Sequence, residues 1–347
     1  MEHPLRLGIA GAGFGAAVHL PVFRALPGVE IVALAAAHPE TARSAAARFG
    51  VDACTGIEAL LDQPLDAVSL ALPPAETERA AAAALARGFA VLAEKPLAAT
   101  AAAAARLAEQ ARGQTAAIGF QFADAPAFIA LGTALRDGVA GPLRAAEIIW
   151  THESYAHRHG RWGWKLDAER QGGVMAMLGS HILFLIERFL GRVASLQASF
   201  DRRATARIAP RGAHPAEDFA SLTATLDSGV PVAIVLGNAT PGLSRHRWTL
   251  ACESGALVLE NVGYSTASGF ALSLHERGGA SRLLLREEAD GMAGDDRQPT
   301  FRRLAERFVA AARRGEACAP DFAAGARVQR LIEASFAAAA GGERVAV

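Results

Sequence analysis

Two hydrophobic periodicities alternate over the first 119 residues. Short continuous apolar runs, typical of buried strands, are separated by longer stretches in which apolar residues recur every three or four positions, as on one face of a helix. The apolar runs predict strands at Leu5–Ala10, Glu30–Ala35, Asp66–Leu72, Phe89–Ala93 and Thr115–Gly119. The helical stretches are Phe14–Leu26, Pro39–Phe49, Ala75–Arg87 and Thr100–Arg112. This alternation predicts an α/β domain with a doubly wound parallel sheet, helices on both faces and a ligand site at the carboxyl ends of the strands.

The pattern changes near Phe120. Successive short strands separated by turn residues predict an antiparallel sheet, and helices precede and follow them. The expected strands are Leu143–Trp150, Ser195–Arg203, Phe219–Leu226, Pro231–Leu236, Arg247–Cys252, Ala256–Glu260, Phe270–His275 and Arg282–Arg286. The expected helices are Ala125–Asp137, Gly173–Leu190, Phe301–Arg313 and Phe322–Ala340. We therefore expect a first domain over residues 1–119 and an α+β domain over residues 120–347, whose closing helices could pack back on the first domain.

The composition disfavours several classes of protein. Lys+Arg and Asp+Glu both number 35, so the charge balance does not favour nucleic acid or an anionic membrane as a partner. Three cysteines, Cys54, Cys252 and Cys318, match neither a disulfide framework nor a zinc site, which favours a reducing cytoplasm. The first predicted strand begins at Leu5, so we expect no signal peptide, and no apolar run is long enough to predict a membrane span.

A glycine-rich turn connects the first predicted strand and helix. Gly11 would permit the tight turn, Gly13 would let the backbone approach a pyrophosphate, and Ala16 is small enough for close packing of helix on strand. The N-terminus of the following helix would direct its N–H groups and positive dipole end at the phosphates. The turn therefore predicts a dinucleotide site whose first contacts are Gly11, Gly13, Phe14 and Gly15.

The end of the second predicted strand bears on which nicotinamide dinucleotide binds. An acidic residue there would bind the ribose 2′-hydroxyl and repel a 2′-phosphate. Ala36 stands at the expected position, and His38 and Arg43 nearby could meet a phosphate. We therefore expect NADP(H) to be favoured over NAD(H).

The tetrapeptide Ala93-Glu94-Lys95-Pro96 closes the strand Phe89–Ala93. In a doubly wound sheet this is the edge where cofactor and substrate meet. Pro96 restrains Lys95 to extended geometry, which restricts where the amine points. This position makes Lys95 a candidate catalytic residue.

These motifs together resemble the Gfo/Idh/MocA family of oxidoreductases, named for glucose–fructose oxidoreductase, inositol 2-dehydrogenase and a rhizopine-catabolism protein. The resemblance extends over the whole chain and rests on GIAGAGFGAAVHLP at the glycine turn, LALPP at 70–74, EKPLA at 94–98 and GGVMAMLGSHILFL at 172–185. It implies an N-terminal Rossmann domain, a C-terminal domain with a large, mostly antiparallel sheet, bound NAD(P), and a homodimer or homotetramer formed through that sheet. The family's substrates are mostly sugars, cyclitols and their keto forms.

The resemblance also assigns roles to individual residues. Lys95 matches the family's catalytic lysine and His181 the histidine of the second domain's long helix, although a buried core histidine is an equal alternative for His181. The family's cofactor contacts include positions matched by Leu72, Pro73 and Glu94. Three positions depart from the family pattern: Met177 and Phe184 replace two aspartates that commonly flank the histidine, and Thr77 replaces a frequent histidine. Without a carboxylate at Met177, the ammonium form of Lys95 loses an opposite charge that would stabilise it.

Residues 150–173 form a polar, aromatic segment that we expect to be a loop. Three of the four tryptophans lie in it, and the resemblance places it over the substrate pocket. Aromatic rings beside Arg, His and Lys could stack on a sugar ring and bind its hydroxyls, whereas a packing or interface loop is the alternative. A metal site is disfavoured because the histidines have no carboxylate–histidine spacing. The expected substrate contacts are Gln121, Tyr155, Trp164, Lys165, Met177 and His181.

The resulting hypothesis is an NAD(P)-dependent oxidoreductase that transfers a hydride between nicotinamide and a cyclic hydroxyl or keto substrate, with Lys95 as acid/base and His181 as an orienting group. Two alternatives stay open. One is a reductase of a C=N bond or an enone in a biosynthetic intermediate. The other is a cofactor-binding protein that has lost catalysis, for which Met177 would be the mark and the retained Glu94-Lys95-Pro96 the counter-argument.

Overall fold

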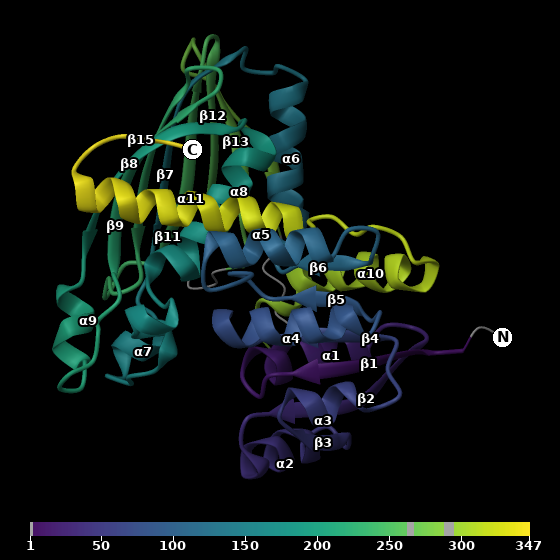
Figure 1. The fold of residues 1–347 in the computed structure, drawn as a ribbon. Coiled ribbons are helices and arrows are strands. Elements are labelled where there is room, and N and C mark those ends of the chain that lie inside the picture. The colour runs from purple at the N-terminus through teal and green to yellow at the C-terminus, as the bar shows by residue number, and fades with distance from the viewer. Residues whose placement is uncertain (1–2, 262–266, 288–294) are drawn as a thin grey trace. The chain divides into compact units, whose positions relative to one another are not determined.

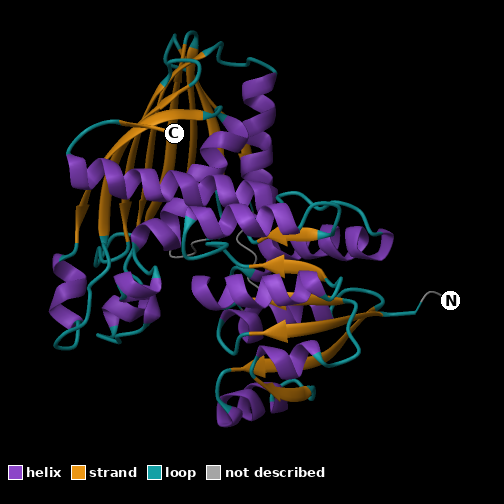
Figure 2. Cartoon of the chain, in the orientation of Figure 1, coloured by secondary structure: helices purple, strands orange, loops and turns teal. Residues whose placement is uncertain are grey.

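The computed structural model describes residues 3–261, 267–287 and 295–347 (Figure 1). The chain divides into two compact units. Unit 1 comprises Met1–Gln121 and Met292–Gln329, and unit 2 comprises Phe122–Gly291 and Arg330–Val347. Helices and strands alternate in unit 1, whereas unit 2 is dominated by one large sheet (Figure 2).

Unit 1 is built on a six-stranded parallel sheet in the order β3-β2-β1-β4-β5-β6. The strands are β1 (Leu5–Ala10), β2 (Val29–Ala36), β3 (Asp52–Thr55), β4 (Ala67–Leu70), β5 (Ala90–Ala93) and β6 (Ala116–Ile118). The doubly wound sheet is therefore confirmed. The edge strand β3 and the short helix α3 (Ile57–Leu61) were not expected, because three of the four residues of β3 are exposed and form no apolar run.

The helices of unit 1 cover both faces of this sheet (Figure 1). They are α1 (Leu20–Arg24), α2 (Pro39–Ala47), α4 (Pro74–Ala86), α5 (Ala101–Gln110) and α10 (Gln298–Arg314). Although α10 is distant in sequence, it packs on α1, where Phe301 and Phe308 lie edge-on to Phe23 with ring centroids 5.8 and 6.2 Å apart. These rings are fully buried and join the core formed with Leu7 and Ile9 of β1.

Unit 2 contains a nine-stranded sheet in the order β14-β13-β12-β11-β7-β10-β9-β8-β15. The strands are β7 (Leu143–Thr151), β8 (Val193–Asp201), β9 (Phe219–Leu226), β10 (Pro231–Gly237), β11 (Arg245–Cys252), β12 (Gly255–Asn261), β13 (Ala271–Glu276), β14 (Ser281–Arg286) and β15 (Val345–Ala346). Only β7 and β10 pair in parallel among the described strands of this sheet, which confirms the mostly antiparallel prediction. The helices α6 (Pro126–Arg136) and α8 (Ser180–Phe189) pack on one face, and α11 (Phe322–Gly341) continues from unit 1 into unit 2.

The expected loop over residues 150–173 is more ordered than predicted. Its first two residues belong to β7, and three short helices lie within the remainder: α7 (Tyr155–Arg158), η3 (Trp164–Leu166) and η4 (Ala168–Arg170). Side chains supply the helix caps: Ser154 accepts a hydrogen bond from the N–H of His157, and Asp167 accepts one from the N–H of Glu169. A loop was therefore the wrong prediction for most of this segment.

Two predicted helices begin with a π turn instead of a regular α-helix. In η1 (Gly15–His19) the N–H of Leu20 donates to the carbonyl of Gly15, and in η5 (Met175–Gly179) the N–H of Ser180 donates to that of Met175. Both bonds span five residues, and single π turns are frequent at functional sites. A periodicity of apolar residues cannot distinguish such a turn from a regular helix.

One described helical stretch, Ala168–Phe189, is long and apolar enough to pass a membrane-span criterion, contrary to expectation. About three quarters (72%) of its most apolar part is buried inside the protein, as in the core helix of a globular domain. This stretch is therefore weak evidence for a membrane.

Candidate active site

The parallel sheet of unit 1 brings several predicted site residues to one edge. Gly11 follows β1, His38 follows β2, Leu72 and Pro73 follow β4, and Lys95 follows β5. Because these strands are parallel and adjacent, their carboxyl ends lie side by side. The order also reverses between β1 and β4, which is where ligands bind in open α/β sheets.

Gly11 and Gly13 of the turn are glycines for different structural reasons. Gly11 has φ +116°, and a Cβ there would lie 2.3 Å from the carbonyl oxygen of Ala71. By contrast, a Cβ on the exposed Gly13 would meet nothing within 4 Å. An open space beside the backbone, next to the start of a helix, fits the pyrophosphate of a dinucleotide. Gly15 is buried, and Ala16, also buried, packs in the core of the unit.

Phe14, predicted as a cofactor contact, packs within unit 1. The guanidinium carbon of Arg297 lies 4.7 Å from the centroid of its ring, and the ring of Phe301 lies edge-on at 6.4 Å. Arg297 also forms an ion pair with Asp295. Phe14 is only partly buried, so one part of the ring is left to meet a ligand.

The residues expected to read the ribose are on the surface. The strand β2 ends at the buried Ala36, and His38 and Arg43 are both exposed. Arg43 forms an ion pair with Glu40, one turn earlier on α2. A 2′-phosphate would therefore have to replace Glu40 as the partner of Arg43.

Leu72 and Pro73 lie at the start of α4 and are partly buried. The hydroxyl of the buried Thr77 donates to the carbonyl of Leu72 at 3.0 Å, and its N–H donates to the carbonyl of Pro73 at 2.8 Å. Thr77 thus has a local role in shaping this turn.

Glu94 and Lys95 leave the end of β5 beside a residue that the motif analysis missed. Glu94 is buried, Lys95 is half-buried, and the peptide bond between Lys95 and Pro96 is cis. His19, fully buried at the end of η1, places Nε2 3.4 Å from Oε1 of Glu94 and Nδ1 2.7 Å from the hydroxyl of Ser69. The signal in the sequence was a histidine among apolar residues of the first helix. Gln121, a predicted substrate contact, is buried at the end of unit 1.

In unit 2, His181 is part of an aromatic cluster. Its ring lies edge-on to Phe122 with centroids 4.9 Å apart, and it is tilted against Trp150 at 6.2 Å. On the other side of Trp150, His246 stacks in parallel at 4.2 Å. His181 is buried, which agrees with the alternative of a core histidine and also with a group that orients a substrate.

Met177 and Phe184, which replace the family's aspartates, are both half-buried. Met177 lies inside the π turn η5, whereas His181 lies in α8. Residues four apart share one face of a regular helix, but this holds only approximately for Met177 and His181, because the π turn changes the phase of the helix at this point.

The remaining predicted substrate contacts lie in the segment before this helix. Tyr155 is 63% exposed, with the guanidinium carbon of Arg161 5.7 Å from the centroid of its ring. The Nζ atom of the exposed Lys165 lies 6.0 Å from the ring of Trp164. The carbonyl of Lys165 accepts a hydrogen bond from the N–H of Gly173, so the segment is attached directly to the start of the His181 helix.

Buried histidines give this unit neutral imidazoles at physiological pH. Burial lowers the pKa of His152 to about 4 and that of His246 to about 3. Burial also lowers the pKa of His157. The sequence alone does not indicate that these histidines are buried, because the residues that bury them come from distant strands.

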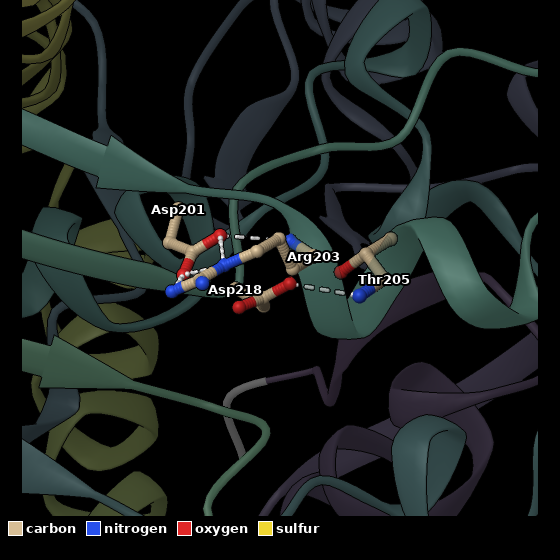
Figure 3. A network of polar contacts seen from close by, with 4 residues as sticks. All are labelled: Asp201, Arg203, Thr205 and Asp218. Atoms are coloured by element: carbon tan, nitrogen blue, oxygen red, sulfur yellow. Dashed lines mark hydrogen bonds and ion pairs between the residues drawn. The ribbon is translucent and has the colours of Figure 1, made fainter.

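A polar network supports the two short helices α7 and α9 (Arg203–Ile208). The imidazole of His157 lies 3.1 Å from the hydroxyl of Thr205, and the N–H of Thr205 donates to a carboxylate oxygen of Asp218 at 2.7 Å. Figure 3 shows this bond beside the ion pair of Asp201 and Arg203. Both pairs hold α9 against the ends of β8 and β9.

Among the described residues, no group of three or more His, Cys, Asp or Glu side chains could hold a metal ion. The unit 1 edge, with its strained Gly11, open Gly13 and adjacent helix, fits a dinucleotide instead.

Comparison with known proteins agrees with this geometry. Residues 5–122 match the family model described as "Oxidoreductase family, NAD-binding Rossmann fold", and residues 128–258 match "GFO/IDH/MocA C-terminal domain". The chain is 33% identical over 276 residues to a dTDP-3,4-didehydro-2,6-dideoxy-alpha-D-glucose 3-reductase of Streptomyces violaceoruber, covering 76% of this chain and 75% of the relative. It is 30% identical over 236 residues to a D-apiose dehydrogenase of Paraburkholderia graminis, and this alignment covers 64% of this chain and 57% of the relative.

Solved structures show the same fold. Levoglucosan dehydrogenase in complex with NADH and L-sorbose superposes with a TM-score of 0.86 at 18% identity, over 100% of this chain and 99% of that one. Family models thus match residues 5–122 and 128–258, and one relative aligns with about three quarters of the chain. The chain belongs to the Gfo/Idh/MocA family of oxidoreductases.

Proposed function

We propose that this enzyme transfers a hydride between a nicotinamide dinucleotide and a ring hydroxyl or keto group of a sugar or cyclitol, with Lys95 as the acid/base group. The observation that carries the proposal is the position of Lys95, half-buried at the end of β5 on the same edge as the glycine turn. Relatives named for a keto-sugar reductase and an apiose dehydrogenase support the substrate class.

The scarcity of lysine among the basic residues of the chain supports a specific role for lysine at position 95. Of the 35 Lys and Arg residues, only Lys95 and Lys165 are lysines. Arginine cannot release a proton in a protein, whereas a lysine amine can both hold and release one. A lysine kept at this edge, in a chain that otherwise uses arginine, is what proton transfer requires.

In this proposal, different residues bind the dinucleotide, transfer the proton and bind the substrate. The backbone around Gly13 and the start of η1 would hold the pyrophosphate, and Leu72, Pro73 and Glu94 would line the path toward Lys95. The nicotinamide, when bound, supplies or accepts the hydride. The amine of Lys95 takes the proton of the substrate hydroxyl in oxidation, and its ammonium returns the proton to the oxygen in reduction. His181 would orient the substrate, and the segment with Tyr155, Trp164 and Lys165 would bind its hydroxyls.

The test is turnover by Lys95 variants on a panel of sugars, cyclitols, keto-sugars and imines, followed by the absorbance of reduced nicotinamide. Lys95→Arg keeps the charge but cannot give up a proton, and Lys95→Met has neither the charge nor a proton to transfer. We expect each to lower kcat by about 10²–10⁴, the usual contribution of general acid–base catalysis. Near-full turnover by Lys95→Arg would refute the role of Lys95.

The same panel tests the alternatives. Turnover restricted to imines or enones would favour the reductase of a biosynthetic intermediate, for which the methionine at position 177 leaves room. Dinucleotide binding with no turnover on any compound would favour a protein that has lost catalysis.

For the cofactor, we propose that NADP(H) binds more tightly than NAD(H). No acidic residue ends β2, and Arg43 lies on the following helix. Arg43→Ala should weaken NADPH binding at least about fivefold and leave NADH binding unchanged, as expected for loss of one charged phosphate contact. Glu40→Ala, which frees Arg43, should strengthen NADPH binding. Tighter binding of NADH than of NADPH by the unaltered protein would contradict the proposal.

We also propose a homodimer or homotetramer formed through the open face of the unit 2 sheet, in the cytoplasm. Along β9, Ala220, Leu222 and Ala224 are buried, whereas Phe219, Ser221 and Thr223 are exposed. Phe219→Glu should reduce the mass measured by light scattering after size exclusion. Val139→Glu, at an exposed apolar position outside the sheet, is the matched control. An unchanged mass of a folded Phe219→Glu protein would contradict this interface.

A further inference from the structure

We propose that His19 is a positioning residue for Lys95 and acts through the carboxylate of Glu94. This inference rests on the proposed function, in which Lys95 transfers the proton. It assigns a role to a residue outside the glycine turn and outside the Glu94-Lys95-Pro96 motif. All of the residues involved lie within unit 1.

The contacts form a continuous chain from β4 to the catalytic lysine. The hydroxyl of Ser69 lies 2.7 Å from Nδ1 of His19, and Nε2 of His19 lies 3.4 Å from Oε1 of Glu94. The other carboxylate oxygen of Glu94 accepts a hydrogen bond from the backbone N–H of Lys95 at 3.3 Å. The carboxylate therefore connects His19 with the backbone of Lys95.

The hydrogen-bonding capacities of these groups decide where the proton on His19 lies. A carboxylate only accepts hydrogen bonds, so Nε2 of His19 must carry the hydrogen that faces Glu94. Ser69 can then donate its hydroxyl hydrogen to Nδ1. Among the described residues, Nε2 of His19 and Oε1 of Glu94 are buried atoms without a hydrogen-bond partner, and they lie 3.4 Å from each other. Catalytic hydrogen bonds are often long before ligands bind, and the 3.4 Å separation allows this one to tighten.

Packing holds both partners in place. The ring of His19 stacks on Phe301 at 4.1 Å with an interplanar angle of 13°, and Phe14 lies edge-on to it at 5.1 Å. Behind Glu94, a Cβ on Gly119 would lie 2.4 Å from Oε1, so the carboxylate fills the space that a larger residue would need. His19 can therefore hold the Glu94 carboxylate, and with it the start of the Lys95 segment, in one position.

Position matters here because proton transfer needs the amine within hydrogen-bond reach of the substrate oxygen. A misplacement of about 1 Å by a change away from the chemistry can lower the rate on the order of 10²-fold. Since His19 ends the π turn that follows the glycine turn, the dinucleotide-binding segment and the lysine would be aligned by the same side chain.

Two amide substitutions separate the two nitrogens of His19. The amide of Gln can reach the position of Nε2 and face Glu94, whereas that of Asn reaches only the position of Nδ1 and faces Ser69. We expect His19→Asn to lower kcat at least about tenfold, with KM and dinucleotide affinity within about twofold, because the loss lies in the transition state. His19→Gln should keep kcat within about threefold of the unaltered enzyme.

The presence of only two lysines provides a readout that needs no turnover. Acylation of the apoprotein, followed by mass spectrometry, gives the labelling of Lys95 relative to the exposed Lys165 as internal reference. We expect His19→Asn to change this ratio more than about twofold and His19→Gln to leave it unchanged, because only the first removes the contact with Glu94. Should His19→Asn fail to fold, Glu94→Ala removes the same contact from the other side and should change the ratio likewise.

Equal kcat and equal labelling ratios for His19→Asn and the unaltered protein would overturn the proposal. An equal loss in His19→Asn and His19→Gln would do so too, because it would indicate a packing role only. Full turnover by Lys95→Arg would instead refute the proposed function, while the labelling ratio would still report on positioning by His19.

Discussion

The carboxylate of Glu217 lies at the start of the helix that carries His181, where its Oε1 accepts a hydrogen bond from the N–H of Met175 at 3.0 Å. The approach is close enough to need a glycine: a Cβ on Gly173, whose φ is +100°, would lie 2.2 Å from the same oxygen. Burial raises the pKa of Glu217 to about 7 despite this hydrogen bond. The side chain therefore titrates near neutral pH at a structurally important position.

This raised pKa predicts a pH-dependent stability. The folded-state pKa lies above the ordinary value of 4.5, so the contribution of Glu217 is complete below pH 4.5 and is lost as the pH rises through 7. Glu217→Gln keeps an acceptor for Met175 without the charge. It should raise the free energy of unfolding at pH 8 by about 1–3 kcal/mol and change it little at pH 4.5. Urea unfolding at both pH values measures this.

The matched control is Glu217→Ala, which leaves the N–H of Met175 without its acceptor and should be less stable than Glu217→Gln at both pH values. A Glu217→Gln protein less stable than the unaltered one at pH 8 would show that the charge contributes favourably after all.

His246 should have the opposite pH dependence. Its Nε2 accepts a hydrogen bond from the indole N–H of Trp248 at 3.0 Å, and burial lowers its pKa to about 3. The stability contributed by the neutral ring is complete above pH 6.5 and is lost as the pH falls toward 3. His246→Gln keeps an acceptor for Trp248 and cannot be protonated.

The difference in unfolding free energy between the unaltered protein and His246→Gln should therefore shift in favour of the variant by about 2 kcal/mol between pH 8 and pH 5, from 1.36 kcal/mol per pKa unit. A difference independent of pH would mean that the pKa of His246 is the same in the folded and unfolded protein. His246→Phe, which removes the acceptor, should cost about 1–3 kcal/mol at pH 8, where the ring of the unaltered protein is neutral.

Gly11 and Gly13 should respond differently to the same substitution. In Gly11→Ala the new methyl group would clash with the carbonyl of Ala71, and the positive φ is unfavourable for alanine. The backbone strain alone should lower the free energy of unfolding by about 1–3 kcal/mol, and the clash adds to this loss. Gly13→Ala meets nothing in the protein and should keep stability within about 0.5 kcal/mol, but it should weaken dinucleotide binding because its methyl group occupies the proposed pyrophosphate space. Thermal unfolding and dinucleotide titration separate the two effects. Undiminished binding by Gly13→Ala would place the pyrophosphate elsewhere.

The two aspartates of Figure 3 should differ in their contribution to stability. Asp218 accepts from the N–H of Thr205, which is only 1% exposed, whereas the partner of Asp201 is the exposed Arg203. Asp218→Ala should cost about 1–3 kcal/mol, because it leaves a buried N–H unsatisfied. Asp201→Ala should cost no more than about 1 kcal/mol, as expected of a surface ion pair. Equal losses in denaturant unfolding would contradict this distinction.

The local pattern of residues determined most of the fold. Leu5–Ala10, an apolar run interrupted only by Arg6, is the strand β1 with the predicted bounds, and Phe219–Leu226, with alternate residues exposed, is β9 with the predicted bounds. Such patterns record which side of an element is buried, and this depends on neighbours in sequence. The glycine turn, Lys95 and His181 could also be found because motif residues are close together in the chain.

Only the tertiary structure decided which polar groups meet. Glu217 lies beside Gly173 although they are 44 positions apart in sequence, and His19 lies beside Glu94 although they are 75 apart, in each case because packing of distant elements brings them together. The same packing determines their chemistry: burial, supplied by strands and helices far along the chain, raises the pKa of Glu217 and lowers that of His246. A sequence pattern contains the residue types of a site, but the desolvation and the partners that define their protonation arise from the folded chain.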